Sequence, residues 1–299
     1  MIALVALLNL ALAVLVGATL AGWWLAGQPS GWAIAAARQA HVTARFAGVS
    51  TLLASVLVLW FQVAVMTELP LMAAAPAVLA VLSGSHFGLC WLTGCAALLT
   101  IIVLQAFNQH GAGQHVIGTG IACALAVFAV SRALVSHAVM EGGLSWSVAS
   151  ESVHLLLVSA WVGMVLVAAW IVLARPPETT SADLDSCRRY TSTLSRAAML
   201  ALAGIVLTGI FNAWRAMGGI SQLVTTSWGL VLSAKLALVG VAVALGAVNR
   251  WRLVPALLDE PYDDKARRQF VMSLRLESGV LMLALIAAAL LSADSPPGD

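Results

Sequence analysis

The sequence predicts an all-α polytopic membrane protein with eight transmembrane helices. Of its 299 residues, 61% are hydrophobic, whereas a soluble domain is about 45–50% apolar. Charged residues are scarce, with 15 Lys and Arg against 13 Asp and Glu. The apolar residues fall into runs of about 20 or more, the length that crosses a bilayer as a helix. These observations exclude a soluble globular enzyme, a disordered chain and a nucleic-acid-binding protein with a basic face.

Eight runs qualify as spans, and all are rich in Ala, Leu, Val and Gly. They are too long to be strands of a membrane barrel. In chain order they cover residues 3–26, 41–66, 86–107, 116–139, 148–174, 190–214, 227–249 and 269–292. The stretch 70–83 is also apolar, but it is short and interrupted by Pro70 and Pro76. We interpret it as an interfacial segment and not as a ninth span.

The positions of Lys and Arg predict the orientation, because basic residues concentrate on the cytoplasmic side of the inner membrane. Charges gather in two segments, 175–189 and 250–277, which we expect to be loops. The connections after the odd-numbered spans hold Arg38, Arg175, Arg188, Arg189, Arg250, Arg252, Lys265, Arg267 and Arg268. Those after the even-numbered spans hold only Arg215. We therefore expect a multi-pass protein of the bacterial inner membrane with both termini in the periplasm.

Two stretches suggest that the chain consists of two parallel four-helix repeats, 1–145 and 146–299. Residues 85–89 (SHFGL) match residues 226–230 (TSWGL), and each begins a span at the outer side. The preceding spans end in Phe61-Gln62 and Phe211-Asn212. Because four spans is an even number, the two halves would have the same orientation.

Three histidines are predicted to lie near the outer edge, on three consecutive spans: His86, His137 and His154. Glu151 and His154 are three residues apart and share a helix face, while Met140 and Cys90 are secondary candidates. Ionisable groups inside a span are costly, so they usually face the bundle interior and indicate a site. Imidazole binds copper among other metals, and Met and Cys favour Cu(I). The alternative is that these histidines are packing residues and that Glu151 pairs with Arg132.

Two further ionisable residues lie deep within spans. Lys235 follows the outer start of the seventh span and Glu277 follows the cytoplasmic start of the eighth. We expect an intramembrane ion pair, because an unpaired charge at this depth costs several kcal/mol. A role in coupling, such as a proton relay, is the alternative.

The second half carries a series of motifs in a fixed order. The matching residues are Leu207-Thr208-Gly209, Asn212-Ala213, Thr226-Ser227-Trp228-Gly229, Lys235-Leu236, Asn249-Arg250 and Arg275-Leu276-Glu277. Upstream stand Ser136-His137-Ala138, His154-Leu155-Leu156 and Trp161-Val162-Gly163. This series resembles the CopD (copper resistance protein D) family. Three positions depart from the family pattern: Gly94, Ser136 and Met164.

The resemblance implies an inner-membrane protein that moves copper across the membrane, with import the more expected direction. It also implies a periplasmic CopC-like copper-binding partner. His137 and His154 carry over best, and His86 is a looser match. In this reading a copper ion, Cu(I) or Cu(II), is bound by His137, His154, His86 and Glu151.

Two other functions fit the same pattern. A haem b electron-transfer protein uses histidine pairs on two helices as axial ligands. A receptor could dock a periplasmic copper carrier without transporting the ion. No Ser-His-Asp set, phosphate-binding loop or HExxH motif occurs, so we do not expect an enzyme. Membrane lipid is the other expected contact, and nucleic acid is not.

Overall fold

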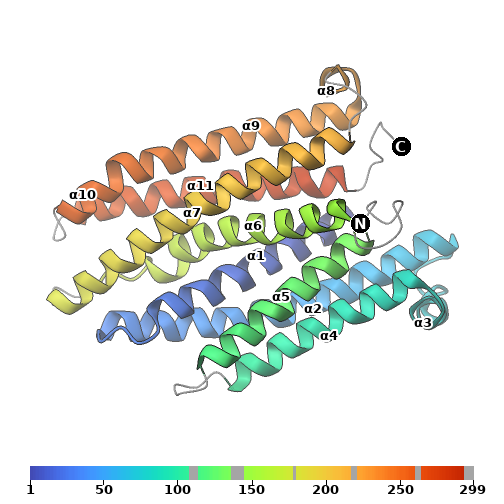
Figure 1. The fold of residues 1–299 in the computed structure, drawn as a ribbon, viewed down its shortest axis with the longest axis horizontal. Helices are drawn as coiled ribbons and strands as arrows, with labels where there is room; N and C mark the ends of the chain where they lie inside the picture. Colours follow the sequence, from blue (N-terminus) through green and yellow to red (C-terminus); the bar gives the residue numbers. More distant parts are fainter. Residues whose placement is uncertain (108–113, 136–144, 178–179, 217–220, 260–263, 293–299) are drawn as a thin grey trace.

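In the computed structural model, eight long helices lie side by side in one bundle (Figure 1), as the sequence predicts. The structure describes residues 1–107, 114–135, 145–177, 180–216, 221–259 and 264–292. The long helices are α1 (Ile2–Leu25), α2 (Gly31–Thr67), α4 (His86–Phe107), α5 (Gln114–Val135), α6 (Trp146–Val167), α7 (Ser181–Ala216), α9 (Ser227–Val248) and α11 (Asp264–Leu291). A π-helical turn extends α6 as η2 (Ala168–Val172), and η3 (Asn249–Leu253) with α10 (Val254–Asp259) extends α9.

The two ends of the bundle differ in what they carry. Figure 1 shows the N-terminus and the C-terminal end of α11 at the same end, together with the short helices α3 (Ala75–Gly84) and α8 (Gln222–Thr225). We call this end the termini face. The opposite end, the arginine face, holds the start of α7 and the α10 segment. Helix α3 contains Pro76 in its first turn and is too short to span a bilayer.

The charged segments are mostly helical, which corrects the expectation of two charged loops. Helix α2 begins ten residues before the predicted span, and α7 begins nine residues before it. These extensions are buried on one side only. The backbone N–H of Trp32 on α2 donates a hydrogen bond of 2.9 Å to the carboxylate of Asp183 on α7. The rings of Trp24 and Trp32 both pack against Tyr190. Contacts between the two halves therefore continue the helices beyond the apolar runs.

The segments that match between the two halves form the same local structure. The Ser85 hydroxyl accepts a hydrogen bond from the N–H of Gly88 at 3.0 Å and donates to the carbonyl of Val81. The Thr226 hydroxyl accepts from the N–H of Gly229, also at 3.0 Å, and donates to the preceding short helix. In both places a short helix precedes the cap, and the glycine lies directly against its backbone. The two matching segments therefore share one capping geometry, and the division of the chain into two repeats stays a prediction.

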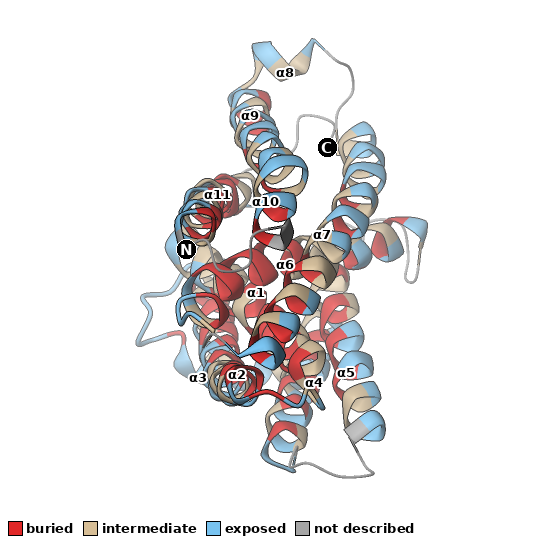
Figure 2. Ribbon diagram, turned by 90° about the vertical axis from the view of Figure 1, so that its left-hand side faces the viewer, coloured by how far each residue is buried: buried red, intermediate tan, exposed pale blue. Residues whose placement is uncertain are grey.

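The centre of the bundle is the crossing of α1 and α6. Gly17 of α1 faces Gly163 of α6, and a Cβ atom on either glycine would overlap the backbone of the opposite helix. Small residues permit such close approach in membranes, where dispersion contacts replace the hydrophobic effect. Figure 2 shows buried residues concentrated in these helices, while α7 and α9 are largely exposed. The most apolar window of α6 is 61% buried, against 11% for α9, so lipid or another molecule must cover α9.

Candidate functional site

The structure fixes the orientation of the His154 ring on α6. Its Nδ1 atom lies 2.9 Å from the hydroxyl oxygen of Thr208 on α7. That hydroxyl donates its own proton to the carbonyl of Gly204 at 2.7 Å, so it can only accept from His154. The carbonyl of Ile205 also lies close to the ring. Nδ1 is therefore the protonated nitrogen, and Nε2 keeps the lone pair that a metal ligand needs.

The α7 residues around Thr208 complete this arrangement. Gly209 leaves room for the ring, because a Cβ atom at that position would lie 3.3 Å from Cε1 of His154. One turn nearer the termini face, the Ser150 hydroxyl donates a hydrogen bond of 2.8 Å to the side-chain carbonyl of Asn212. Both contacts join α6 to α7. The Leu207-Thr208-Gly209 and Asn212 positions thus hold the face of α6 that carries His154.

A lysine from α9 lies within electrostatic range of this histidine. Lys235 is close enough for its charge to act on the His154 ring. It has no hydrogen bond or ion pair with any residue in the described part of the chain. We call His154, Thr208 and Lys235 the histidine cluster. It brings a potential metal ligand and a positive charge together, so it would bind a cation weakly rather than tightly.

A second cluster lies deeper, where α6, α9 and α11 meet. Glu277 on α11 is 3% exposed, and its carboxylate accepts a hydrogen bond of 2.7 Å from the side-chain nitrogen of Asn249. The Trp161 indole lies within hydrogen-bonding range of the same carboxylate. These three residues, the carboxylate cluster, line a cavity of about 190 Å³. The side-chain oxygen of Asn249 is buried there without a partner among the described residues.

The structure does not join Lys235 to Glu277, the ion pair expected from the sequence. The helix that carries Lys235 continues into η3, and there Asn249 contacts the carboxylate. Fourteen residues separate the two positions on this helix, which corresponds to a rise of about 21 Å. Lys235 therefore belongs to the histidine cluster near the termini face. Glu277 takes an amide as its partner instead.

His86 and Cys90 form a separate pair on α4. The Cys90 sulfur lies 3.8 Å from Nδ1 of His86, and His86 is exposed at the start of the helix. Helix α4 packs against α2, α3 and α5, whereas α6 carries His154. The structure therefore places these two histidines in different halves of the bundle.

The remaining predicted ligands are Glu151, His137 and Met140. Glu151 on α6 lies within electrostatic reach of Arg132 on α5, the alternative partner considered for it. His137 and Met140 lie outside the described residues. Within the described ranges, no three His, Cys, Asp or Glu side chains come together in a group that could hold a metal ion. The expectation that His137 is one of four copper ligands is therefore not tested.

Comparison with protein-family models assigns both halves of the chain. The model for copper resistance protein D matches residues 187–291. A second, for the copper resistance protein D-like N-terminal domain, matches residues 1–148. The two matches do not overlap, and they cover more than four-fifths of the chain. The chain belongs to the copper resistance protein D family.

Two curated relatives agree with that assignment. The chain is 27% identical to "Copper resistance protein D" of Pseudomonas syringae pv. tomato over 68% of this chain and 67% of that protein. It is 31% identical to "Inner membrane protein YebZ" of Escherichia coli over 32% of each chain. No solved structure matches. The protein is therefore a multi-pass inner-membrane member of a copper-related family.

The copper resistance protein D match contains most of both clusters. Thr208, Lys235, Asn249 and Glu277 lie inside residues 187–291, whereas His154 and Trp161 of α6 fall between the two matched regions. Reasoning from the sequence did not assign roles to Thr208, Asn249 or Trp161. The sequence did contain a signal for these three residues, because each of them stands in a motif that resembles the family pattern. Only the fold shows which motifs meet.

Proposed function

We propose that this protein carries copper across the inner membrane through its second half, inward from the periplasm. The observation that supports this most is the His154 ring, whose Nδ1 is engaged by Thr208 while Nε2 is free to bind a metal. On this proposal the termini face is periplasmic, as the distribution of Lys and Arg predicts. A CopC-like periplasmic protein would deliver the ion, and copper is cargo that leaves chemically unchanged.

The two clusters suggest the order of the steps. Copper binds first at His154 and then passes to the carboxylate cluster, whose Trp161 is seven residues further along α6. Seven residues correspond to about 10 Å of helix rise, so one short step separates the clusters. Glu277 supplies a negative charge, and the unpartnered oxygen of Asn249 supplies a second acceptor. Transport requires sites that bind well enough to accept an ion and weakly enough to release it.

Replacing Glu277 tests the transport proposal. In vesicles containing the purified protein and a copper-sensitive dye, wild type should admit copper, and Glu277→Gln should lower the initial rate about tenfold. Glutamine retains an acceptor for Asn249 but removes the charge that would attract the ion, a loss of about 1.4 kcal/mol or more. A wild-type protein that binds copper but gives no flux would contradict transport and favour the receptor function.

Replacing Lys235 tests the weak binding of the histidine cluster. Lys235→Gln should increase copper affinity about tenfold, because it removes roughly 1–2 kcal/mol of repulsion at His154. The same variant should release copper more slowly in the vesicle assay. Affinity is measured by competition with a chelator of known strength. Unchanged affinity in Lys235→Gln would mean that copper does not bind beside this lysine. Lys265→Gln is the control, because it removes a lysine on α11 that is not part of the histidine cluster.

A further inference from the structure

A large groove lies outside both clusters, at the arginine face. It has a volume of about 1040 Å³ and runs between α2 and the end of α6 with η2. Along α2 its lining extends from Gly31 to Thr43, a rise of about 18 Å. Its lining includes Ile34, Arg38, Gln39, Val42, Ile171 and Arg175. The groove therefore begins at the end of the bundle and continues along the helices toward the membrane.

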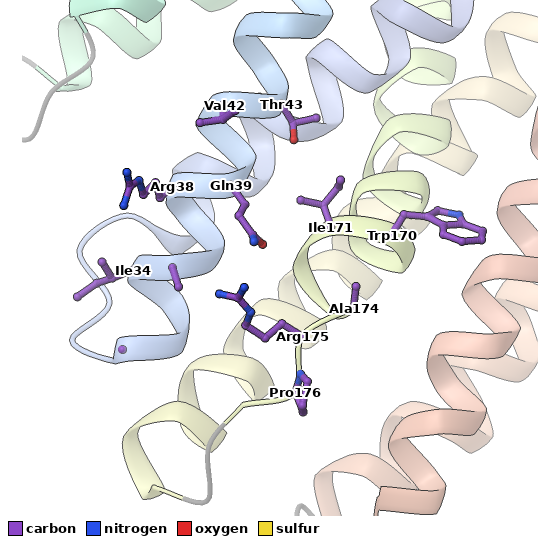
Figure 3. Close-up of a pocket in the computed structure, with 12 residues that line it drawn as sticks. Ile34, Arg38, Gln39, Val42, Thr43, Trp170, Ile171, Ala174, Arg175 and Pro176 are labelled. Carbon is purple, nitrogen blue, oxygen red and sulfur yellow. The ribbon is translucent and has the colours of Figure 1, made fainter.

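The polar part of this groove is positively charged and unpaired. Arg38 and Arg175 are exposed, and neither guanidinium group forms a hydrogen bond or ion pair with any residue that the structure describes. None of the lining residues is acidic. Figure 3 shows Gln39 on α2 and Arg175 after η2 extending toward one another across the groove. Guanidinium and amide N–H groups placed in this way favour an anion with several acceptor oxygens, such as a phosphate.

The remaining wall of the groove is apolar and uncovered. Ile34 and Val42 on α2 are 62% and 44% exposed, and Ile171 and Ala174 add apolar surface from the other wall. Water is a poor solvent for such a surface, and a free inorganic phosphate would leave it bare. A ligand with a phosphate at one end and hydrocarbon at the other matches both parts. The arginine face is also the side on which basic residues meet anionic lipid.

We propose that this groove binds an anionic phospholipid, with its phosphate between Arg38, Gln39 and Arg175 and an acyl chain along Ile34 and Val42. The lipid would contact α2 from the first half and η2 from the second. It would thereby join the halves at the end where Trp32 already contacts Asp183. This site is independent of the copper clusters.

Native mass spectrometry of the purified full-length protein in detergent tests the proposal. Phosphatidylglycerol should bind as a discrete adduct, and phosphatidylcholine should bind much more weakly. The double variant Arg38→Gln, Arg175→Gln should bind phosphatidylglycerol about 25-fold more weakly, since each arginine near an anionic lipid contributes a factor of about five. Arg175→Gln alone should show about a fivefold loss, and it serves as the readout if the double variant folds poorly.

The control removes two other arginines from the same face. Arg189 on α7 and Arg252 on η3 are exposed and lie outside the groove, so Arg189→Gln, Arg252→Gln should retain wild-type affinity. Equal losses in the two double variants would show only general attraction to a basic surface and would overturn the proposal. Displacement of the lipid by millimolar inorganic phosphate would identify a site for a free anion instead. Equal binding of phosphatidylcholine would also overturn it.

Discussion

Replacing His154 with alanine should abolish copper binding at the histidine cluster, with a loss of affinity of more than about 100-fold. The ring presents Nε2 as a ligand only because Thr208 accepts the proton of Nδ1. Partners of this kind contribute about 10–100-fold to metal affinity, and the ligand itself contributes more. Binding is measured as copper retained against a competing chelator. X-ray absorption should show a nitrogen ligand in wild type that is missing from His154→Ala.

The Thr208 variants separate a ligand role from a packing role. Thr208→Val keeps the side-chain shape and removes the hydroxyl, so copper affinity should fall about 10–100-fold. Thr208→Ser keeps the hydroxyl and should remain near wild type. His115→Ala is the matched control, because it removes an exposed imidazole on another helix. If His154→Ala retains wild-type copper affinity and vesicle flux, His154 is a packing residue and the proposed site is incorrect.

Replacing Gly163 with alanine should greatly reduce the yield of folded protein. A Cβ atom at this position would overlap the carbonyl of Ala13 on α1, and Gly17 faces it from the same helix. The overlap is with backbone, so no flexible side chain can move aside, and the helices would have to separate. Overpacking of this kind costs about 3 kcal/mol or more. Fluorescence-detected size exclusion and the thermal midpoint in detergent measure the effect.

Gly240 provides the control for this substitution. It also lies within a span, on α9, but a Cβ atom there would meet nothing within 4 Å. Gly240→Ala should therefore fold with wild-type yield and a similar thermal midpoint. If Gly163→Ala behaves like Gly240→Ala, the close crossing of α1 and α6 does not stabilise the bundle.

The apolar runs were sufficient to predict the eight spans, because the bilayer imposes a minimum length that the sequence shows directly. The helix ends were less accurate. Residues 31–40 and 181–189 contain Arg38, Asp183 and Arg189, so their composition favoured connecting segments. Both segments are helical because they bury one side against the other half, as the contacts of Trp32 and Tyr190 show. A window of hydropathy does not detect burial that depends on a distant partner.

Which polar groups pair with one another depended on the fold even more than the positions of the helix ends did. His154, Lys235 and Glu277 were recognised as candidates because each is costly in a membrane. The partners of these residues were not predicted correctly. The sequence gives the depth of a residue along its helix, but it does not give the rotation of one helix relative to another. That limit explains why Lys235 was matched with Glu277. In the structure the lysine lies within electrostatic range of His154, and the carboxylate accepts a hydrogen bond from Asn249.

The sequence by itself therefore determined the membrane class, the number of spans and, through its motifs, the family of this protein. Each of these properties is recorded locally, in the composition of a span or in a short motif. Only the tertiary structure decided that Thr208 orients His154, that Asn249 is the partner of Glu277, and that Gly163 meets α1. Those contacts join residues on different helices. Their geometry follows from how closely the helices pack and how each is rotated, which composition and spacing do not specify.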